Sequence, residues 1–325
     1  MKLSLRRSEI QAFKALCLKE NEGVSIVGLA SSLGKSKSFT SRIVGSLVEK
    51  GFVELTRQGK KKTVKISPAQ HAVMLKELLA SNPHILFEDI LQGAAVQVLT
   101  GLLYSSASVE AISVSSFSPE VTVRLVLNRM LDRGIVTRQK LGSYSIVLPR
   151  LRDFIESYIR FAVEAKRTGV QGSLIICGAS GLIRTSEAEI PAFMVSTGLN
   201  AFGKFGVKLI QTDFKDYYFN ILKPVKKPSF EEVLVHSLVR ATLVSSSREL
   251  SYVLLVIAKN RKTLNQARFF NVARQYSVES SAKQCIEFVD AVLAGKEIPK
   301  PLVVIGEGTA FPDETEFTEL LKQYE

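Results

Sequence analysis

Tryptophan is absent from the 325 residues of this sequence, and cysteine and histidine occur three times each. Cys17, Cys177 and Cys285 are far apart and form no C-x-x-C pair, which argues against a disulfide framework and against a zinc site. We expect three reduced thiols in a cytoplasmic protein. No apolar run reaches the roughly 18 residues that a membrane-spanning helix needs. The sequence therefore predicts no metal, no cofactor and no membrane partner.

Acidic residues are scarce in the first 70 positions, which hold 14 Lys and Arg against five Glu and no Asp. This segment carries +9 of the formal net charge of +12, so the other 255 residues carry only +3. Such a basic segment favours an anionic partner, although net charge says nothing about fold. Because 46% of the residues are hydrophobic, the chain can build two or three packed domains. We expect anion binding at the N-terminus.

Three helices are predicted before residue 51. Apolar residues recur at helical spacing in three stretches, which are residues 7–20, 25–33 and 36–50. Ser25 and either Ser36 or Ser38 are suitable N-caps, and Gly34 and Gly51 are suitable C-terminal stops. The third helix has an inward face of Phe39, Ile43, Val44 and Leu47 and an outward face of Ser38, Thr40, Ser41, Arg42 and Ser46.

A basic hairpin is predicted to follow the third helix. Residues 52–56 and 63–67 alternate apolar and polar side chains as half-buried strands do, and they flank the turn RQGKKK at 57–62. This turn contains the cations Arg57, Lys60, Lys61 and Lys62. One interpretation is a solvated turn that charge keeps soluble. The other is a surface that neutralises phosphates.

This order of elements resembles the winged helix-turn-helix of prokaryotic and archaeal transcription regulators of the MarR and ArsR kind, over about 70 residues. The resemblance implies that the third helix enters the major groove of double-stranded DNA, while the hairpin contacts the backbone. It also implies a homodimer, because operators of such families are palindromic. The expected DNA-binding residues are Lys35, Lys37, Ser38, Thr40, Ser41, Arg42, Arg57, Lys60, Lys61 and Lys62. Arg42 is the residue suited to bond a guanine in bidentate fashion.

A repeat follows at an offset of 83 residues, because LVEKGFV at 47–53 returns as MLDRGIV at 130–136. A second winged helix is therefore predicted over 84–149, with a first helix through Leu91 and Leu102, a short helix from Ser108 to Ile112, and a third helix capped by Ser118. In this copy the offset places Val121 where Ser38 stood and Leu125 where Arg42 stood.

An apolar reading face suits a protein interface better than DNA, so we interpret the second copy as a dimerisation or domain-packing module. Residues 71–150 hold seven Lys and Arg against six acids, which agrees with this interpretation. An accessory DNA contact stays open as the alternative, and the residues that would make it are Arg124, Asn128, Arg129 and Lys140.

The C-terminal half is predicted to be a mixed α/β domain with a helical tail. We expect a linker helix over 151–169, then the strand-like runs SLIICGASGLIRTS, VKLIQTD and DYYFNIL, and helices from Pro228 onward. The fold class is thus α+β, with domains at 1–70, 84–149 and 150–325.

This half loosely resembles archaeal regulators of unassigned function and abortive-infection antitoxins, which repress their own operon. The alternative function is therefore an antitoxin-like protein that binds a toxin or other partner through its C-terminal domain. We predict no enzyme, because the D-x-K at Asp213 and Lys215 is the only faint trace of a catalytic motif. His236 lies among apolar helical residues and is expected to be a core histidine.

Overall fold

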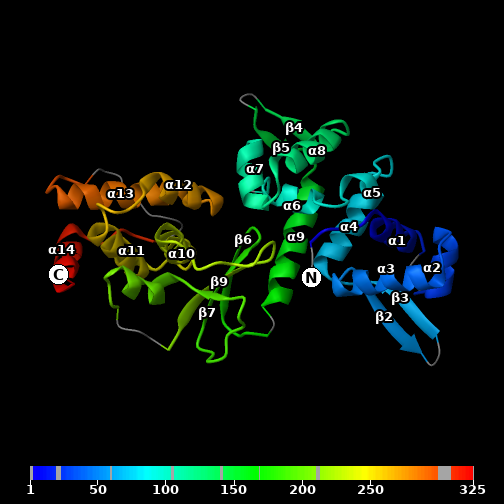
Figure 1. Ribbon diagram of the computed structural model, residues 1–325, viewed down its shortest axis with the longest axis horizontal. Coiled ribbons are helices and arrows are strands. Elements are labelled where there is room, and N and C mark those ends of the chain that lie inside the picture. Colours follow the sequence, from blue (N-terminus) through cyan, green and yellow to red (C-terminus); the bar gives the residue numbers. More distant parts are fainter. Residues whose placement is uncertain are drawn as a thin grey trace. The chain divides into compact units, whose positions relative to one another are not determined.

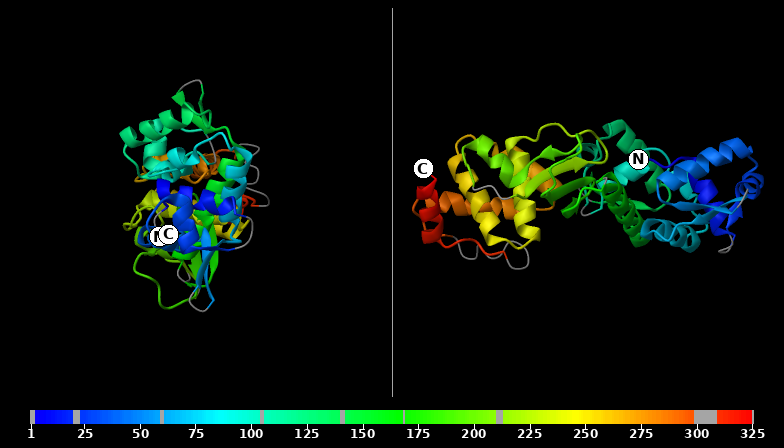
Figure 2. Two further views of the ribbon diagram at one scale, coloured as in Figure 1. Left: turned by 90° about the vertical axis from the view of Figure 1, so that its right-hand side faces the viewer. Right: turned by 90° about the horizontal axis from the view of Figure 1, so that it is seen from below.

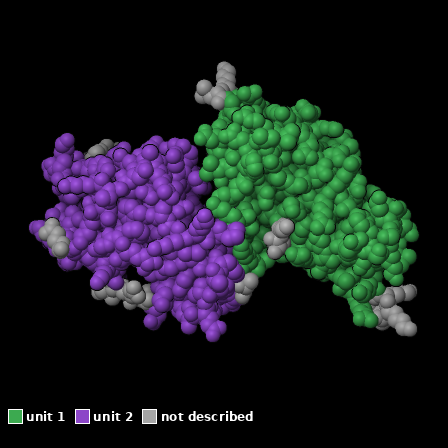
Figure 3. Space-filling model, viewed as in Figure 1, with its two compact units in different colours: residues 1–168, 221–223 green, residues 169–220, 224–325 purple. Residues whose placement is uncertain are grey.

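The computed structural model describes residues 3–19, 23–58, 61–103, 106–139, 142–167, 169–209, 213–298 and 309–324. Side chains at 58 and 61 are outside this description. The chain is α+β, with small antiparallel sheets, and it divides into two compact units (Figure 3). Unit 1 comprises residues 1–168 and 221–223, and unit 2 comprises residues 169–220 and 224–325.

Unit 1 begins with three helices around the base of a hairpin, whose far end extends beyond them (Figure 1). The helices are α1 (Arg7–Cys17), α2 (Ile26–Leu33) and α3 (Lys37–Glu49). The strands are β1 (Val24–Ser25), β2 (Val53–Gln58) and β3 (Lys61–Ile66), arranged in the order β1-β3-β2. Both strands of the hairpin are longer than predicted, because cross-strand pairing continues through the basic residues to Gln58 and Lys61.

The helix ends of this first copy follow local capping chemistry. The Ser25 hydroxyl accepts a hydrogen bond from the Gly28 amide, and the Ser36 hydroxyl accepts one from the Phe39 amide. Gly34 ends α2 in the left-handed conformation at φ 60°, where a side chain would be strained. The predicted caps Ser25 and Ser36 and the predicted stop Gly34 are confirmed. Ser36 rather than Ser38 caps α3.

The second copy reproduces the backbone of the first at the predicted offset of 83 residues. Its elements are α5 (Phe87–Ile90), α6 (Ala95–Thr100), α7 (Val109–Ser116), α8 (Glu120–Leu131), β4 (Val136–Arg138) and β5 (Tyr144–Ile146). Ser108 caps α7 as Ser25 caps α2, and Phe117 adopts φ 52° where Gly34 has φ 60°. Even the bridge from Val24 to the hairpin has its counterpart at Ala107. The internal repeat is confirmed at the level of the backbone.

Two details of the second copy differ from prediction. Its first helix is interrupted, because α5 and α6 are separated by Gly93 at φ 70°. Ser118 does not cap α8: its hydroxyl is buried and donates to the Ser116 carbonyl, and the N-cap position is Pro119. A periodic apolar pattern cannot reveal such a break, because residues on both sides of it face the same core.

A helix follows each copy, and the two helices pack together. They are α4 (Gln70–Ser81) and α9 (Pro149–Lys166). His71 of α4 lies among Phe52, Tyr158 and Phe161, with ring centroids 4.7, 5.4 and 4.3 Å away. The predicted boundary at 150 therefore differs from the structure: α9 buries its apolar face within unit 1, and unit 2 begins at residue 169.

Unit 2 has three layers, in which α10 and α11 lie between a sheet and the pair α12 and α13 (Figure 1). The antiparallel sheet has the order β6-β7-β9-β8, formed by β6 (Ser173–Cys177), β7 (Ser180–Thr185), β8 (Val195–Ser196) and β9 (Lys215–Asn220). A 3-10 helix, η2 (Gly198–Phe205), precedes β9. The helices are α10 (Phe230–Leu243), α11 (Ser247–Lys259), α12 (Gln266–Gln275), α13 (Glu279–Leu293) and α14 (Glu314–Gln323), with α14 at the end of the helical layers (Figure 2).

The mixed C-terminal organisation is confirmed, with one strand misplaced. Residues 207–209 of VKLIQTD are not in a strand, and residues 210–212 lie outside the described part. The sequence IGEGTAF at 305–311 predicts a turn, and its residues 305–308 are also outside the described part. Among the described helices, none combines the length and apolar character needed to span a lipid bilayer.

Candidate functional site

All predicted contact residues at α3 except Thr40 are exposed on unit 1. Lys35 and Lys37 flank the start of the helix, and both are exposed. Ser38, Ser41 and Arg42 are exposed on the helix itself. The guanidinium of Arg42 lies 5.8 Å from the centroid of the half-buried Phe39 ring, which rests the side chain against the helix. Five of the ten predicted residues therefore share a basic, hydroxyl-bearing surface.

Thr40 does not belong to this surface, and the prediction that it does is wrong. Its side chain is 0% exposed, and its hydroxyl donates to the Ser36 carbonyl at 3.0 Å. Residues three to four positions apart share a helix face, and Thr40 shares one with Ile43, Val44 and Leu47 of the core. A small polar residue at that position is satisfied within its own helix, so its polarity misled the reading of the sequence.

The hairpin places cations opposite one another. Arg57 pairs with Lys62 across β2 and β3, and both are exposed. They follow the pair Leu55 and Val64 along the same face of the ribbon. Val64 is buried in this pair, whereas Leu55 is 40% exposed, so the cations lie beyond the edge of the core. Two exposed cations on opposite strands form a positively charged surface at this part of the hairpin. The side chains of Lys60 and Lys61 are outside the described part.

A buried ion pair fixes the C-terminal end of α3. The Lys50 Nζ lies 2.6 Å from the Glu9 Oε2 and 2.8 Å from the Ser4 carbonyl oxygen. Glu9 also accepts hydrogen bonds from the Ser46 hydroxyl at 2.7 Å and from the Arg6 amide at 2.8 Å. Both groups are paired and further hydrogen bonded, which compensates their burial although almost no water reaches them. It holds α3 against α1.

His71 completes the support of this helix from α4. Its Nε2 donates to the Lys50 carbonyl oxygen at 3.0 Å, so the neutral ring fixes the residue that ends α3. Burial lowers the pKa of His71 to about 4, and the hydrogen bond to Lys50 only partly offsets this. The folded state therefore requires the uncharged imidazole.

This requirement predicts a loss of stability in mild acid. Between pH 6.5 and 4 the unfolded chain binds a proton at His71 that the folded chain does not, so the free energy of unfolding falls as the pH falls. At pH 4.5 the contribution of His71 to this loss is expected to be roughly 2 to 3 kcal/mol relative to pH 7. Urea unfolding at both pH values measures it, with His71→Gln as the variant that should lose less and the exposed His84→Gln as control. Equal losses in wild type and His71→Gln would contradict the assignment.

The corresponding face of the second copy is apolar at four equivalent positions, although Lys37 and Ser41 correspond to Glu120 and Arg124. Ser31, Gly34, Ser38 and Arg42 are replaced at the offset of 83 by Val114, Phe117, Val121 and Leu125. These four side chains are 50, 40, 70 and 65% exposed. We call this set the apolar face. Isolated apolar residues on a surface need no explanation, but four on adjoining helices indicate an interaction surface.

The second copy gives little support to the alternative of an accessory DNA contact. Arg124 forms an ion pair with Glu120 at 3.1 Å, and Arg129 donates to the Asp89 carbonyl oxygen at 2.8 Å. Asn128 is exposed, and Lys140 lies outside the described residues. The two arginines are thus already engaged within unit 1.

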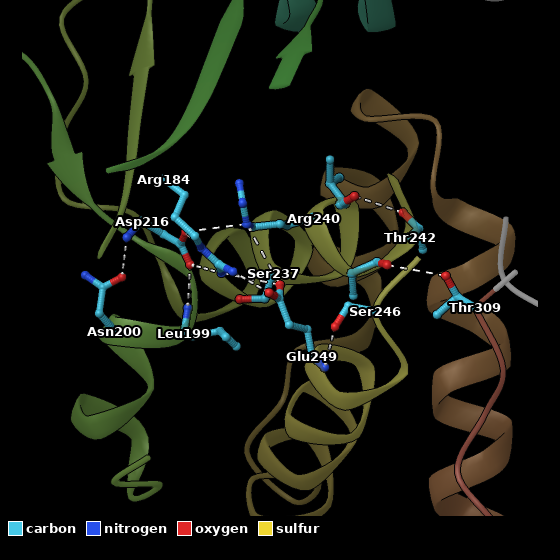
Figure 4. Close-up of polar contacts among 12 residues, drawn as sticks. Arg184, Leu199, Asn200, Asp216, Ser237, Arg240, Thr242, Ser246, Glu249 and Thr309 are labelled. Carbon is cyan, nitrogen blue, oxygen red and sulfur yellow. Dashed lines mark hydrogen bonds and ion pairs between the residues drawn. The ribbon is translucent and has the colours of Figure 1, made fainter. Parts of the chain in front are cut away.

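Unit 2 contains a cluster of two arginines and two carboxylates where β7, β9, α10 and α11 meet (Figure 4). Arg184 grips Asp216 in bidentate fashion, with Nε to Oδ1 at 2.6 Å and Nη2 to Oδ2 at 2.8 Å, and its Nη1 also bonds Glu249. Burial alone would lower the pKa of Arg184, but these hydrogen bonds raise it above its usual value. We call Arg184, Asp216, Arg240 and Glu249 the ion cluster.

Arg240 is the member of the ion cluster that forms no hydrogen bond with the two carboxylates. Its Nε lies 3.7 Å from Asp216 and 3.9 Å from Glu249, too far for hydrogen bonds. Its Nε and Nη1 are buried and have no hydrogen-bond partner among the described residues. Burial lowers the pKa of Arg240, and the charge of Arg184 lowers it further.

His236 is a locally bonded core histidine, as predicted. Its Nδ1 lies 2.8 Å from the Thr197 hydroxyl and its Nε2 lies 2.9 Å from the Tyr276 hydroxyl. Burial lowers its pKa to about 3, so the ring is neutral at physiological pH. Both ring nitrogens are occupied, so His236 has no free nitrogen for a ligand.

Sequence reasoning missed the ion cluster because its members are far apart in the chain. Asp216 is 32 residues from Arg184, and Glu249 is 65 residues from it. One local signal existed: α10 is buried on all sides, and Arg240 is the cation within that apolar stretch. A charge in such a helix indicates a buried ionic site.

The described part of the chain shows neither a metal-binding group of side chains nor a reactive thiol. No group of three His, Cys, Asp or Glu side chains there is arranged to hold a metal ion. The three cysteines are free thiols, and burial raises the pKa of Cys17 to about 11 and of Cys177 to about 12. These thiols are protonated at neutral pH and therefore poor nucleophiles.

Comparison with known proteins yields a partial family match. The family model described as HVO_2833_C, C-terminal, matches residues 191–325, which is less than half of the chain and covers unit 2 from β8 onward. No curated protein matches the sequence. A crystal structure of ScpB from Mycobacterium tuberculosis matches over 44% of this chain and 92% of that chain, at 15% identity and a TM-score of 0.16. That TM-score is too low for the likeness to support an assignment of fold or function.

Proposed function

We propose that this protein is a DNA-binding transcription regulator whose first copy is a winged helix-turn-helix. In this proposal α3 enters the major groove of double-stranded DNA, and the hairpin of β2 and β3 contacts the phosphate backbone. The order of α1, α2, α3 and a hairpin, with β1 added to its edge, supports the winged-helix assignment.

The observation that carries the proposal is the contrast between the two copies. They share the serine cap of the second helix, the left-handed turn after it and the strand positions, yet the exposed face of α3 has Ser38 and Arg42 where α8 has Val121 and Leu125. Shared backbone with opposite surface chemistry indicates that the polar surface of the first copy serves a partner rather than the fold. Its cations, short hydroxyl side chains and hairpin suit phosphates and base edges.

Replacing Arg42 by alanine tests base readout. If Arg42 bonds a guanine, the variant should lose roughly 1 to 3 kcal/mol of binding free energy on preferred duplexes and lose the preference at one base pair. Selection of binding sequences from a random duplex pool, followed by fluorescence anisotropy on the selected sites, measures both effects.

Lys37→Ala is the matched control, because Lys37 is an exposed cation at the start of the same helix. A phosphate contact there should weaken binding to all sequences alike. Equal losses across all sequences for Arg42→Ala would leave Arg42 without a role in readout.

The apolar face supports association of two chains through the second copy. Burying Val121 and Leu125 of both protomers would remove four exposed side chains from water, each contributing roughly 1.5 to 3 kcal/mol. An interface related by twofold symmetry would also present two DNA-binding copies to a palindromic site. This dimer is the expected form in solution.

Val121→Lys combined with Leu125→Lys tests the dimer. Burying four cations at the interface should raise the dimer dissociation constant by more than about 100-fold, which corresponds to roughly 2.7 kcal/mol. Sedimentation velocity over a concentration series measures this, with Leu243→Lys, another exposed apolar position, as control. A wild-type chain that stays monomeric at tens of micromolar would rule out this interface.

A further inference from the structure

Gly45 lies in the interior of α3, where glycine is the least favourable residue apart from proline. Its φ is not in the left-handed region, so the backbone does not require glycine. Packing does not require it either. Apart from its chain neighbours and the backbone of its own helix, no described atom lies within 4 Å of the point that a β-carbon would occupy. The fold therefore holds a helix-weakening residue at an exposed position without a structural need for it.

The second copy shows that the shared backbone accepts a side chain at this position. The offset of 83 places Asn128 where Gly45 stands. Asn128 is exposed, and α8 is helical on both sides of it, from Glu120 to Leu131. The two copies thus differ here as they do at Ser38 and Arg42, at a position that faces outward.

Gly45 shares a helix face with residues that are proposed to contact DNA. It follows Arg42 by three positions and Ser41 by four, and residues at these spacings are neighbours on the surface of a helix. All three residues are exposed. Because no side chain covers the helix backbone at Gly45, a partner on this face can approach that backbone more closely than at any residue with a β-carbon.

We propose that Gly45 is the point at which α3 comes closest to double-stranded DNA, and that its missing side chain sets how deeply the helix enters the groove. The inference rests on the proposed DNA binding by α3. Glycine is the residue that lets a backbone approach a ligand closely. The weaker helix at Gly45 then accompanies the closer contact, as stability and function oppose one another at many binding surfaces. Gly45 offers neither charge nor a side-chain hydrogen bond, so its contribution is steric.

Gly45→Ala in the full-length protein tests the proposal through two effects of opposite benefit. The urea concentration at the midpoint of unfolding should rise, because alanine favours a helix more than glycine does. The dissociation constant for a duplex selected from the random pool should nevertheless rise by about tenfold, comparable to the effect of one mismatched base pair. Gly45→Asn, which introduces the residue of the second copy, should weaken binding further because its side chain is larger. Urea unfolding and fluorescence anisotropy measure the two effects.

Gly203→Ala is the matched control, because Gly203 is an exposed glycine of η2 in unit 2 with open space at its β-carbon position. It should leave the dissociation constant unchanged, and an equal loss there would overturn the proposal. Unchanged affinity in both Gly45 variants would overturn it too, while the proposed DNA binding would stand. A lower unfolding midpoint in Gly45→Ala would mean that the fold itself needs the glycine, which also overturns the proposal. A wild-type chain that binds no duplex would instead overturn the proposed function, and this inference with it.

Discussion

Replacing Lys60, Lys61 and Lys62 together by alanine is expected to weaken binding to every DNA duplex and to flatten its salt dependence. Each phosphate contact contributes about 0.9 to the slope of log K against log salt concentration, so the slope should become shallower by about 2.7 if all three contact phosphates. Sequence preference should be retained, because phosphate contacts position a protein without reading bases. Fluorescence anisotropy at several salt concentrations measures both quantities.

A matched control removes the same charge from unit 2. Lys204, Lys226 and Lys227 are exposed there, and their replacement by alanine lowers the net charge by the same amount. If the whole basic chain attracted DNA without a defined surface, both triple variants would lose affinity alike. We expect the unit 2 variant to retain nearly the full slope. An unchanged slope in the hairpin variant would mean that the basic hairpin is a solvated turn that does not contact phosphates.

Lys50→Met is expected to destabilise unit 1 by about 3 to 5 kcal/mol, because it leaves the Glu9 carboxylate buried without its counter-charge. Glu9 is 1% exposed, so water cannot replace the ammonium group. Urea unfolding followed by circular dichroism gives the size of the loss. Hydrogen–deuterium exchange of peptides from α1 and α3 locates it.

Two further variants separate the buried charge from the loss of packing. Glu9→Gln combined with Lys50→Met removes both charges, while the side-chain carbonyl of the introduced glutamine can still accept from the Ser46 hydroxyl, so this double variant should be more stable than Lys50→Met alone. Arg124→Met breaks the exposed pair with Glu120, and exposed pairs contribute less than about 1 kcal/mol. A loss below about 1 kcal/mol for Lys50→Met would mean that the pair does not hold α3.

The Lys50→Met variant connects the stability of unit 1 with the proposed DNA binding. Lys50 ends α3, and its carbonyl and ammonium groups are held by His71 and Glu9. If α3 packs less tightly against α1, Ser38 and Arg42 are displaced, although the substitution itself changes no exposed residue. Loss of DNA affinity in Lys50→Met, reversed in the double variant, is therefore the expected pattern.

Local chemistry determined much of unit 1. Ser25, Ser36, Gly34 and Gly51 act on backbone groups within a few residues of themselves, so helix ends were readable from the chain. Alternating side chains located the hairpin, and the offset of 83 residues anticipated a second copy in which Ser108 and Phe117 take the places of Ser25 and Gly34. The distribution of charge along the chain likewise placed the basic surface at the N-terminus.

Tertiary structure decided which polar groups are exposed and which are buried together. Thr40 turned inward because its helix face packs on the core, although its composition suited the surface. Glu9 and Lys50 are 41 residues apart, and the ion cluster joins strands and helices that no local pattern connects. Burial of a charge depends on partners brought close by folding, and sequence spacing carries no record of those distances. The unsatisfied donors of Arg240 became visible only once the elements around it had their places.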